Sequence, residues 1–257
     1  MTQARRASKP KDLPMSRIAS LPHAALPHAA LPHAALPLAA TLLAALLATL
    51  SASAPALAAD VGKAHGHKGV LKPYARPPPP LVLTEKEKAR IESGKSVMRQ
   101  MEGEAGGRGM AIFRVDATPD VVWAIINDFG SYPKWIDEVK KCEIYKKDGG
   151  KIDVAFKISS FPVSIEYFIA HDYDMANRWG TWTLDYNRES DLDDSVGFWR
   201  VTPVEGDATR SMVEYSVDVK IKGWVPDFIR EMLVDKGLKQ ATHWVKVQSE
   251  KKQLAAK

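Results

Sequence analysis

The sequence predicts an α+β protein in which six to seven antiparallel strands form a sheet that is covered by one long C-terminal helix. Three observations predict this class. Apolar and polar residues alternate in successive segments between residues 109 and 221, as half-buried strands require. A helix with clear start signals interrupts these segments at 118–129, and a broad apolar face over 226–252 predicts the final helix.

The segment 118–136 combines a helix start, an apolar helix and an aromatic turn. Thr118 is placed to cap the helix, Pro119 suits its first position, and Asp120 lies near the positive end of its dipole. Aromatic residues surround Gly130 where the helix ends, namely Phe129, Tyr132 and Trp135. This turn could roof a cavity.

The strands are separated by turn signals. We expect strands at 109–115, 139–147, 152–158 and 163–169, one around Trp182 and Leu184, one at 197–201 and one at 213–221. The last has the strictest alternation, and a register slip of one residue would bury its polar and charged side chains. The helix at 226–252 must cover the apolar face of this sheet, with Phe228, Ile229, Met232, Leu233, Leu238, Ala241 and Val245 near one side.

The N-terminal 59 residues predict an export signal. Basic residues precede an apolar run, 38–50, and small residues at 56–58 suit a signal peptidase. The run has 13 residues, fewer than the roughly 20 that span a membrane. We therefore expect an exported protein, periplasmic or secreted, with an N-terminal membrane tether only if the leader is not cleaved.

Three further parts follow the leader. Residues 60–83 contain Gly, Lys, His and the run RPPPP, which predicts a Pro-rich disordered spacer. Residues 84–104 predict a short N-terminal helix and a connection, and 105–252 predict the folded domain.

Charge and cysteine content exclude several classes. The isoelectric point near 9.1 owes much to the leader, because the rest of the chain holds 31 basic and 30 acidic residues. Without the leader, the chain has no cluster of basic residues that would bind nucleic acid. The single cysteine, Cys142, cannot form an internal disulfide, and we interpret it as an unpaired strand residue.

The order of elements, together with VVWAIINDFGSYPKWI and GFWRV, resembles the START-like helix-grip superfamily (SRPBCC), in particular its polyketide cyclase/dehydrase and coenzyme-Q-binding branch. The resemblance covers about residues 105–250. It implies a helix-grip fold, in which a curved sheet wraps around the final helix and a hydrophobic ligand lies between them. No catalytic motif is shared across the superfamily, so the resemblance assigns no catalytic residue.

Aromatic residues on neighbouring strands can converge on the side that faces the helix. The candidate ligand-binding residues are Phe156, Tyr167, Trp182, Trp199, Tyr215 and, on the helix, Met232. Tyr132, Trp135 and Trp224 are candidates for the cavity entrance, and such rings suit transient contact with a membrane surface. The sequence thus predicts an exported protein that encloses a lipid, quinone or polyketide-like molecule, with no cofactor.

Two alternatives stay open. His171 shares strand parity with Tyr167 and could enter the cavity, which would suit a cyclase or hydrolase acting on a polyketide-like or ester substrate. The other alternative is a packed interaction module without ligand. The residues favour binding over catalysis, and we assign no catalytic residue.

Other polar groups receive structural interpretations. We place His243 at the surface, and we interpret the acidic cluster Glu189, Asp191, Asp193 and Asp194 as a solvated hairpin loop. His65 and His67 are the right residue type for a metal, but two ligands in a flexible spacer make a poor site. We therefore expect no metal.

Overall fold

The computed structural model describes residues 59–103, 106–160, 163–223 and 237–256. The leader, Trp224 and Met232 lie outside these ranges, so the interpretations placed on them stay predictions. Among the described residues, none of the helices is long and apolar enough to cross a membrane.

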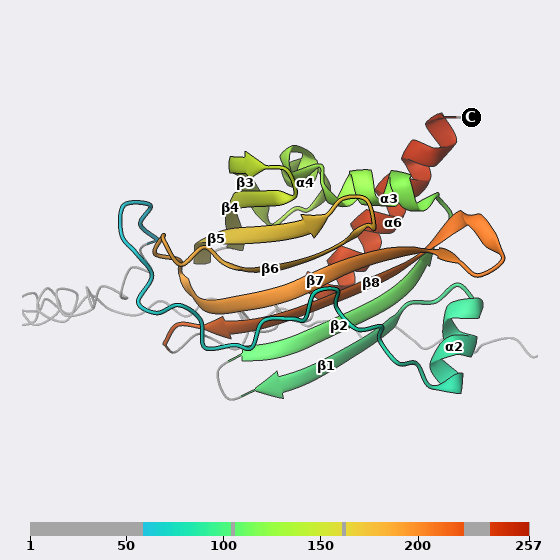
Figure 1. Cartoon of the computed structure of the whole chain (residues 1–257), viewed down its shortest axis with the longest axis horizontal. Helices are drawn as coiled ribbons and strands as arrows, with labels where there is room; N and C mark the ends of the chain where they lie inside the picture. The colour runs from blue at the N-terminus through green and yellow to red at the C-terminus, as the bar shows by residue number, and fades with distance from the viewer. Residues whose placement is uncertain (1–58, 104–105, 161–162, 224–236, 257) are drawn as a thin grey trace, which may run out of the picture. The chain divides into compact units, whose positions relative to one another are not determined.

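Eight antiparallel strands form one sheet in the described residues, in the order β1-β2-β8-β7-β6-β5-β4-β3 (Figure 1). Their bounds are β1 Val97–Gly103, β2 Gly106–Val115, β3 Val139–Asp148, β4 Lys151–Ser160, β5 Val163–Asp174, β6 Trp179–Leu184, β7 Leu192–Val204 and β8 Asp207–Ile221. The helices are α2 Glu85–Glu92, α3 Pro119–Ile126, the 3-10 turn η1 Phe129–Ser131, α4 Tyr132–Trp135 and α6 Gly237–Ala255. The chain has the predicted helix-grip α+β fold: a large curved sheet with the C-terminal helix α6 packed against it.

The prediction of six to seven strands did not include β1. This strand carries few apolar side chains, and it buries Val97 beside Ile91 of α2 and Ile112 of β2 in a small second core. Because that core forms between elements on the edge of the sheet, β1 has no long alternating pattern to reveal it. The predicted connection within 84–104 is therefore partly a strand.

The helix α3 forms where the sequence predicts it, with Pro119 at its start. The expected cap is wrong: within the described residues, the side chain of Thr118 makes no capping hydrogen bond. The backbone N–H of Thr118 instead donates to Gln253 Oε1 on α6 at 3.1 Å. The start of α3 is therefore tied to the C-terminal helix.

The segment 60–83, expected to be a disordered spacer, packs across β7 and β8 on the side away from α6 (Figure 1). The N–H groups of Val70 and Leu71 both donate to Asp194 Oδ2 at 2.7 Å. Farther along, Tyr74 packs on Phe198 with 5.0 Å between ring centroids, and its hydroxyl lies 2.6 Å from Ser216 Oγ. The segment has no core of its own, but side chains of the sheet satisfy its backbone groups.

A buried ion pair fixes the proline-rich end of this segment. Nη2 of Arg200 on β7 lies 2.6 Å from Oε2 of Glu214 on β8, and their side chains are 12% and 11% exposed. Arg200 also donates to the carbonyls of Pro78 and Pro79, and Glu214 accepts from the N–H of Leu81. We name residues 60–83 the N-terminal strap.

Candidate functional site

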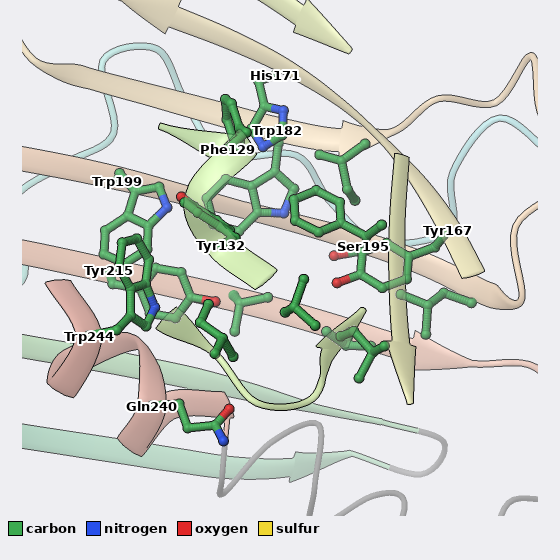
Figure 2. A pocket seen from close by; sticks show the side chains of 18 of the residues that line it. Phe129, Tyr132, Tyr167, His171, Trp182, Ser195, Trp199, Tyr215, Gln240 and Trp244 are labelled. Carbon is green, nitrogen blue, oxygen red and sulfur yellow. The ribbon is translucent and has the colours of Figure 1, made fainter. Parts of the chain in front are cut away.

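A cavity of about 200 Å³ lies between the concave face of the sheet, α6 and the η1–α4 turn (Figure 2). Most of its walls are aromatic or aliphatic. The lining residues are Phe129, Tyr132, Ile136, Val139, Phe156, Ile158, Tyr167, Ile169, His171, Tyr173, Trp182, Leu192, Ser195, Trp199, Tyr215, Val217, Val219, Gln240 and Trp244. Apolar walls with a few polar groups are typical of a small-molecule binding site.

Five of the six candidate ligand-binding residues line this cavity, namely Phe156, Tyr167, Trp182, Trp199 and Tyr215. Strand register brings them together, because Phe156 pairs with Tyr167 and Trp199 pairs with Tyr215 across neighbouring strands. The strand alternation thus predicted which side chains converge. That they bind a ligand stays a prediction.

Their rings stack along the sheet. Phe156 and Tyr167 are nearly parallel, with centroids 5.2 Å apart and an interplanar angle of 8°. Tyr215 lies between Trp199 and Trp182, at centroid distances of 4.1 and 5.9 Å. Such contacts fix ring orientations. The wall is therefore a set of supported flat surfaces.

The aromatic turn closes one side of the cavity, as expected. Tyr132 is buried at 6% exposure, and its hydroxyl donates to the carbonyl of Ile126 at 2.6 Å. Trp135 stacks on Trp244 of α6 at 5.7 Å and supports the wall from outside the lining set. Of the three candidate entrance residues, Tyr132 is thus a wall residue, Trp135 lies behind it, and Trp224 is outside the described residues.

Helix α6 contributes two lining residues that sequence reasoning missed, Gln240 and Trp244. Gln240 donates to Glu138 and so joins α6 to the loop before β3. The helical period showed that this face is buried but could not separate residues facing a cavity from residues in a filled core. Tyr173 of β5 and Ser195 of β7 were also missed, because strand alternation shows which face is buried but not which of its residues line a cavity. Phe129, which belongs to the predicted aromatic turn, lines the cavity as well.

His171 enters the cavity wall, as its strand parity predicts, and is buried. Its Nδ1 lies 3.0 Å from the carbonyl oxygen of Ile152. Because a carbonyl can only accept, Nδ1 carries the proton and Nε2 is left as an acceptor. Burial lowers the pKa of His171 to about 4, although the bond to Ile152 partly opposes this. The ring is neutral at pH 7.

The cavity phenols are hydrogen-bond donors. Burial raises the pKa of both Tyr167 and Tyr215 well above the ordinary value, so both hydroxyls stay protonated. Together with His171 Nε2, they supply donors and an acceptor within a largely apolar space. A ligand with one or two oxygens could be oriented by them.

The remaining candidates lie elsewhere. Cys142 is buried, and burial raises the pKa of its thiol, which makes it unreactive. His243 is exposed on α6, as expected. The solvated loop expected for the acidic cluster is wrong: Asp194 is fully buried and accepts from Tyr186 and the strap.

Comparison with known proteins identifies the family. The sequence model of the family described as polyketide cyclase / dehydrase and lipid transport matches residues 115–245. The chain belongs to this family. The matched region includes every residue that lines the cavity, from Phe129 to Trp244. A search of curated proteins found no match.

Solved structures with similar folds include the aromatase/cyclase Zhui from Streptomyces sp. R1128, with 20% identity, 60% of this chain and 94% of that chain covered, and a TM-score of 0.48. A START superfamily protein from Mycobacterium smegmatis has 17% identity, covers 56% and 97%, and has a TM-score of 0.47. A STAR-related lipid transfer protein from Xanthomonas axonopodis has 15% identity, covers 60% and 92%, and has a TM-score of 0.47. Similarities at this level carry no argument about function.

Proposed function

We propose that this protein binds one compact hydrophobic ligand in the cavity between its sheet and α6. The observation that carries this proposal is the cavity itself, which has a volume of about 200 Å³. Its aromatic wall residues stack on one another, as Phe156 and Tyr167 do, and leave the space between them open. Removing apolar ligand surface from water supplies the affinity, at about 25 cal/mol per Å².

The volume limits the ligand. An apolar cavity of roughly 150 Å³ is known to hold benzene, whereas pockets for drug-sized ligands start at about 300 Å³. A space of about 200 Å³ therefore suits a single substituted ring or a short chain. A lipid, a quinone or a polyketide-like molecule would place one such part inside.

Polar groups in the wall favour a ligand that carries oxygen. The hydroxyls of Tyr167 and Tyr215 can donate to a carbonyl, and Nε2 of His171 can accept from a hydroxyl. A wholly apolar ligand would displace water from these groups and leave them without partners, which costs free energy.

The site supports binding better than catalysis. General-base catalysis is most efficient when the pKa of the base lies near the working pH. Burial lowers the pKa of His171 to about 4, so its imidazole is a weak base at neutral pH. Cyclase or hydrolase activity on a polyketide-like or ester substrate is the alternative that the experiment must exclude.

Native mass spectrometry of gently purified protein tests the proposal. We expect a mass increment for one hydrophobic molecule per chain, which organic extraction recovers unchanged. Conversion of an added aromatic polyketide or ester, lost in His171→Gln, would favour the enzyme. No bound molecule, together with no uptake of any added hydrophobic ligand, would overturn both.

Export is a separate part of the proposal, supported by the leader sequence. The expected cleavage site is at 56–58, and residues 1–58 lie outside the described residues. N-terminal sequencing of the protein made in its own cell should find a chain that starts near Ala59. A chain that keeps the leader and stays in the cytoplasm would contradict export. Contact with a membrane surface stays a prediction.

A further inference from the structure

Two histidines of the N-terminal strap meet an aspartate at the start of β7, more than 120 residues away in sequence. His65 Nε2 lies 2.8 Å from the main-chain oxygen of Asp193, and His67 Nε2 lies 3.2 Å from Asp193 Oδ1. The two imidazole rings are perpendicular, with centroids 4.8 Å apart. One ligand atom from each of the three residues falls within 4.8 Å of the others.

The backbone of β7 is built irregularly at this point. Leu192 pairs with Ile221 and Asp194 pairs with Lys220, so Asp193 is an extra residue in a β-bulge. A bulge frees the backbone of its extra residue from the ladder and re-aims its side chain. Here it presents both a carbonyl and a carboxylate oxygen of Asp193 to the histidines.

We propose that His65, His67 and Asp193 bind a divalent transition-metal ion of the zinc class, which joins the N-terminal strap to the sheet. Two imidazole nitrogens and a carboxylate are a usual ligand set for Zn²⁺, whereas Mg²⁺ and Ca²⁺ prefer oxygen alone. The main-chain oxygen of Asp193 or a water is available as the fourth ligand. The site lies outside the cavity and does not depend on the function proposed for it.

Binding requires a modest rearrangement. Two ligands of a tetrahedral zinc ion lie about 3.4 Å apart, so a pair separated by 4.8 Å must close by about 1.4 Å. The side chains of His67 and Asp193 are 28% and 24% exposed. Because neither side chain is enclosed by packing, both can change rotamer to approach the ion.

Each imidazole must also present an unprotonated Nε2 to the ion, so its proton moves to Nδ1. Four hydrogen bonds are lost as a result. Nε2 of His65 and of His67 no longer donate to the main-chain oxygen and to Oδ1 of Asp193, at 2.8 and 3.2 Å. Their Nδ1 atoms no longer accept from Ser190 N–H at 3.4 Å and from Gly69 N–H at 3.0 Å. Metal–ligand bonds at such sites are much stronger than neutral hydrogen bonds. Lys220, 3.2 Å from Asp193 Oδ2, occupies the other carboxylate oxygen and leaves Oδ1 for the ion.

Isothermal titration of the full chain with ZnCl₂, after removal of metals with EDTA, tests the site. We expect one equivalent of zinc to bind, and both His67→Gln and Asp193→Ala to weaken this binding by at least about tenfold. The matched control is the triple variant His23→Gln/His28→Gln/His33→Gln, which removes the histidines of the leader and should leave this equivalent intact. Zinc should also raise the Tm of the wild type and slow tryptic cleavage at Lys63 and Lys68, but not in His67→Gln.

Two results would overturn the proposal. One is zinc binding that the leader variant loses and both site variants retain. The other is the absence of any zinc-dependent change in titration, Tm and cleavage in the wild type. Since His67 and Asp193 are partly exposed, at least one of the two site variants should fold, which circular dichroism without metal will show.

Discussion

The indole of Trp182 on β6 lies over Gly197 of the neighbouring strand β7. The two residues pair in register, and a Cβ added at Gly197 would lie 2.0 Å from Trp182 Cζ2 and 2.5 Å from the carbonyl oxygen of Ser216. Gly180 of β6 receives the ring of Tyr173 in the same way, at 1.9 Å. Two large rings of the cavity wall thus lie flat against the sheet because glycines leave space for them.

Gly197→Ala should therefore push Trp182 into the cavity. We expect a loss of about 1–3 kcal/mol in the free energy of unfolding, as in other overpacked cores, and weaker ligand uptake. Urea unfolding and binding of an environment-sensitive apolar dye measure the two effects.

Gly130→Ala is the matched control for this substitution, because a Cβ at Gly130 would meet no atom within 4 Å. It should leave dye binding unchanged. Equal stability and equal dye binding in Gly197→Ala and the wild type would show that Trp182 does not need the glycine.

His171 should make stability depend on pH. Its folded pKa, about 4, lies below the ordinary 6.5, so between these values the unfolded chain holds a proton that the folded chain does not. Stability is then complete above about pH 6.5 and falls as the pH drops toward 4, at about 1.4 kcal/mol per pH unit at most.

Urea unfolding of the wild type and of His171→Gln at several pH values between 4.5 and 7, chosen to span roughly this window, checks the pH dependence. We expect a shallower loss of stability on acidification in the variant. Parallel pH profiles for the two proteins would mean that His171 is not a buried neutral group.

The Arg200–Glu214 pair should hold the N-terminal strap. Glu214→Gln leaves the largely buried guanidinium without its carboxylate, and we expect a loss of about 3 kcal/mol in the free energy of unfolding. Chymotrypsin should also cut faster after Tyr74, because the backbone of Leu81 loses the carboxylate that accepts its N–H bond. Urea unfolding and timed digestion give these quantities.

An exposed ion pair supplies the comparison for the buried one. Glu85→Gln, which removes the Lys88–Glu85 pair on α2, should change neither unfolding nor digestion measurably. If Glu214→Gln behaved like Glu85→Gln, the strap would be held by other contacts.

Much of the sheet was predictable because alternation has one physical cause. Strands β4, β5 and β8 each have an apolar face toward the cavity and α6, so a period of two identified them and placed Phe156, Tyr167 and Tyr215 on the same side. Strand β1 was not predicted, because it buries Val97 in a small core outside that face.

The strap was not predictable from composition. Its order comes from single hydrogen bonds between its backbone and carboxylates more than 100 residues away, such as Leu71 N–H to Asp194 and Leu81 N–H to Glu214. A local pattern carries no signal for such contacts. The same contacts bury Asp194, which the sequence suggested was solvated.

Replacement of Val217, which lines the cavity from β8, tests the central claim most directly. Val217→Phe fills the space without adding charge, and Val247→Phe makes the same change at an exposed position on α6. We would titrate an environment-sensitive apolar dye into the wild type and both variants and count sites by fluorescence. A hollow interior predicts one site per chain in the wild type and in Val247→Phe, and at least about tenfold weaker binding in Val217→Phe. Equal dye binding by all three proteins, or none by the wild type, would contradict a ligand cavity between the sheet and α6.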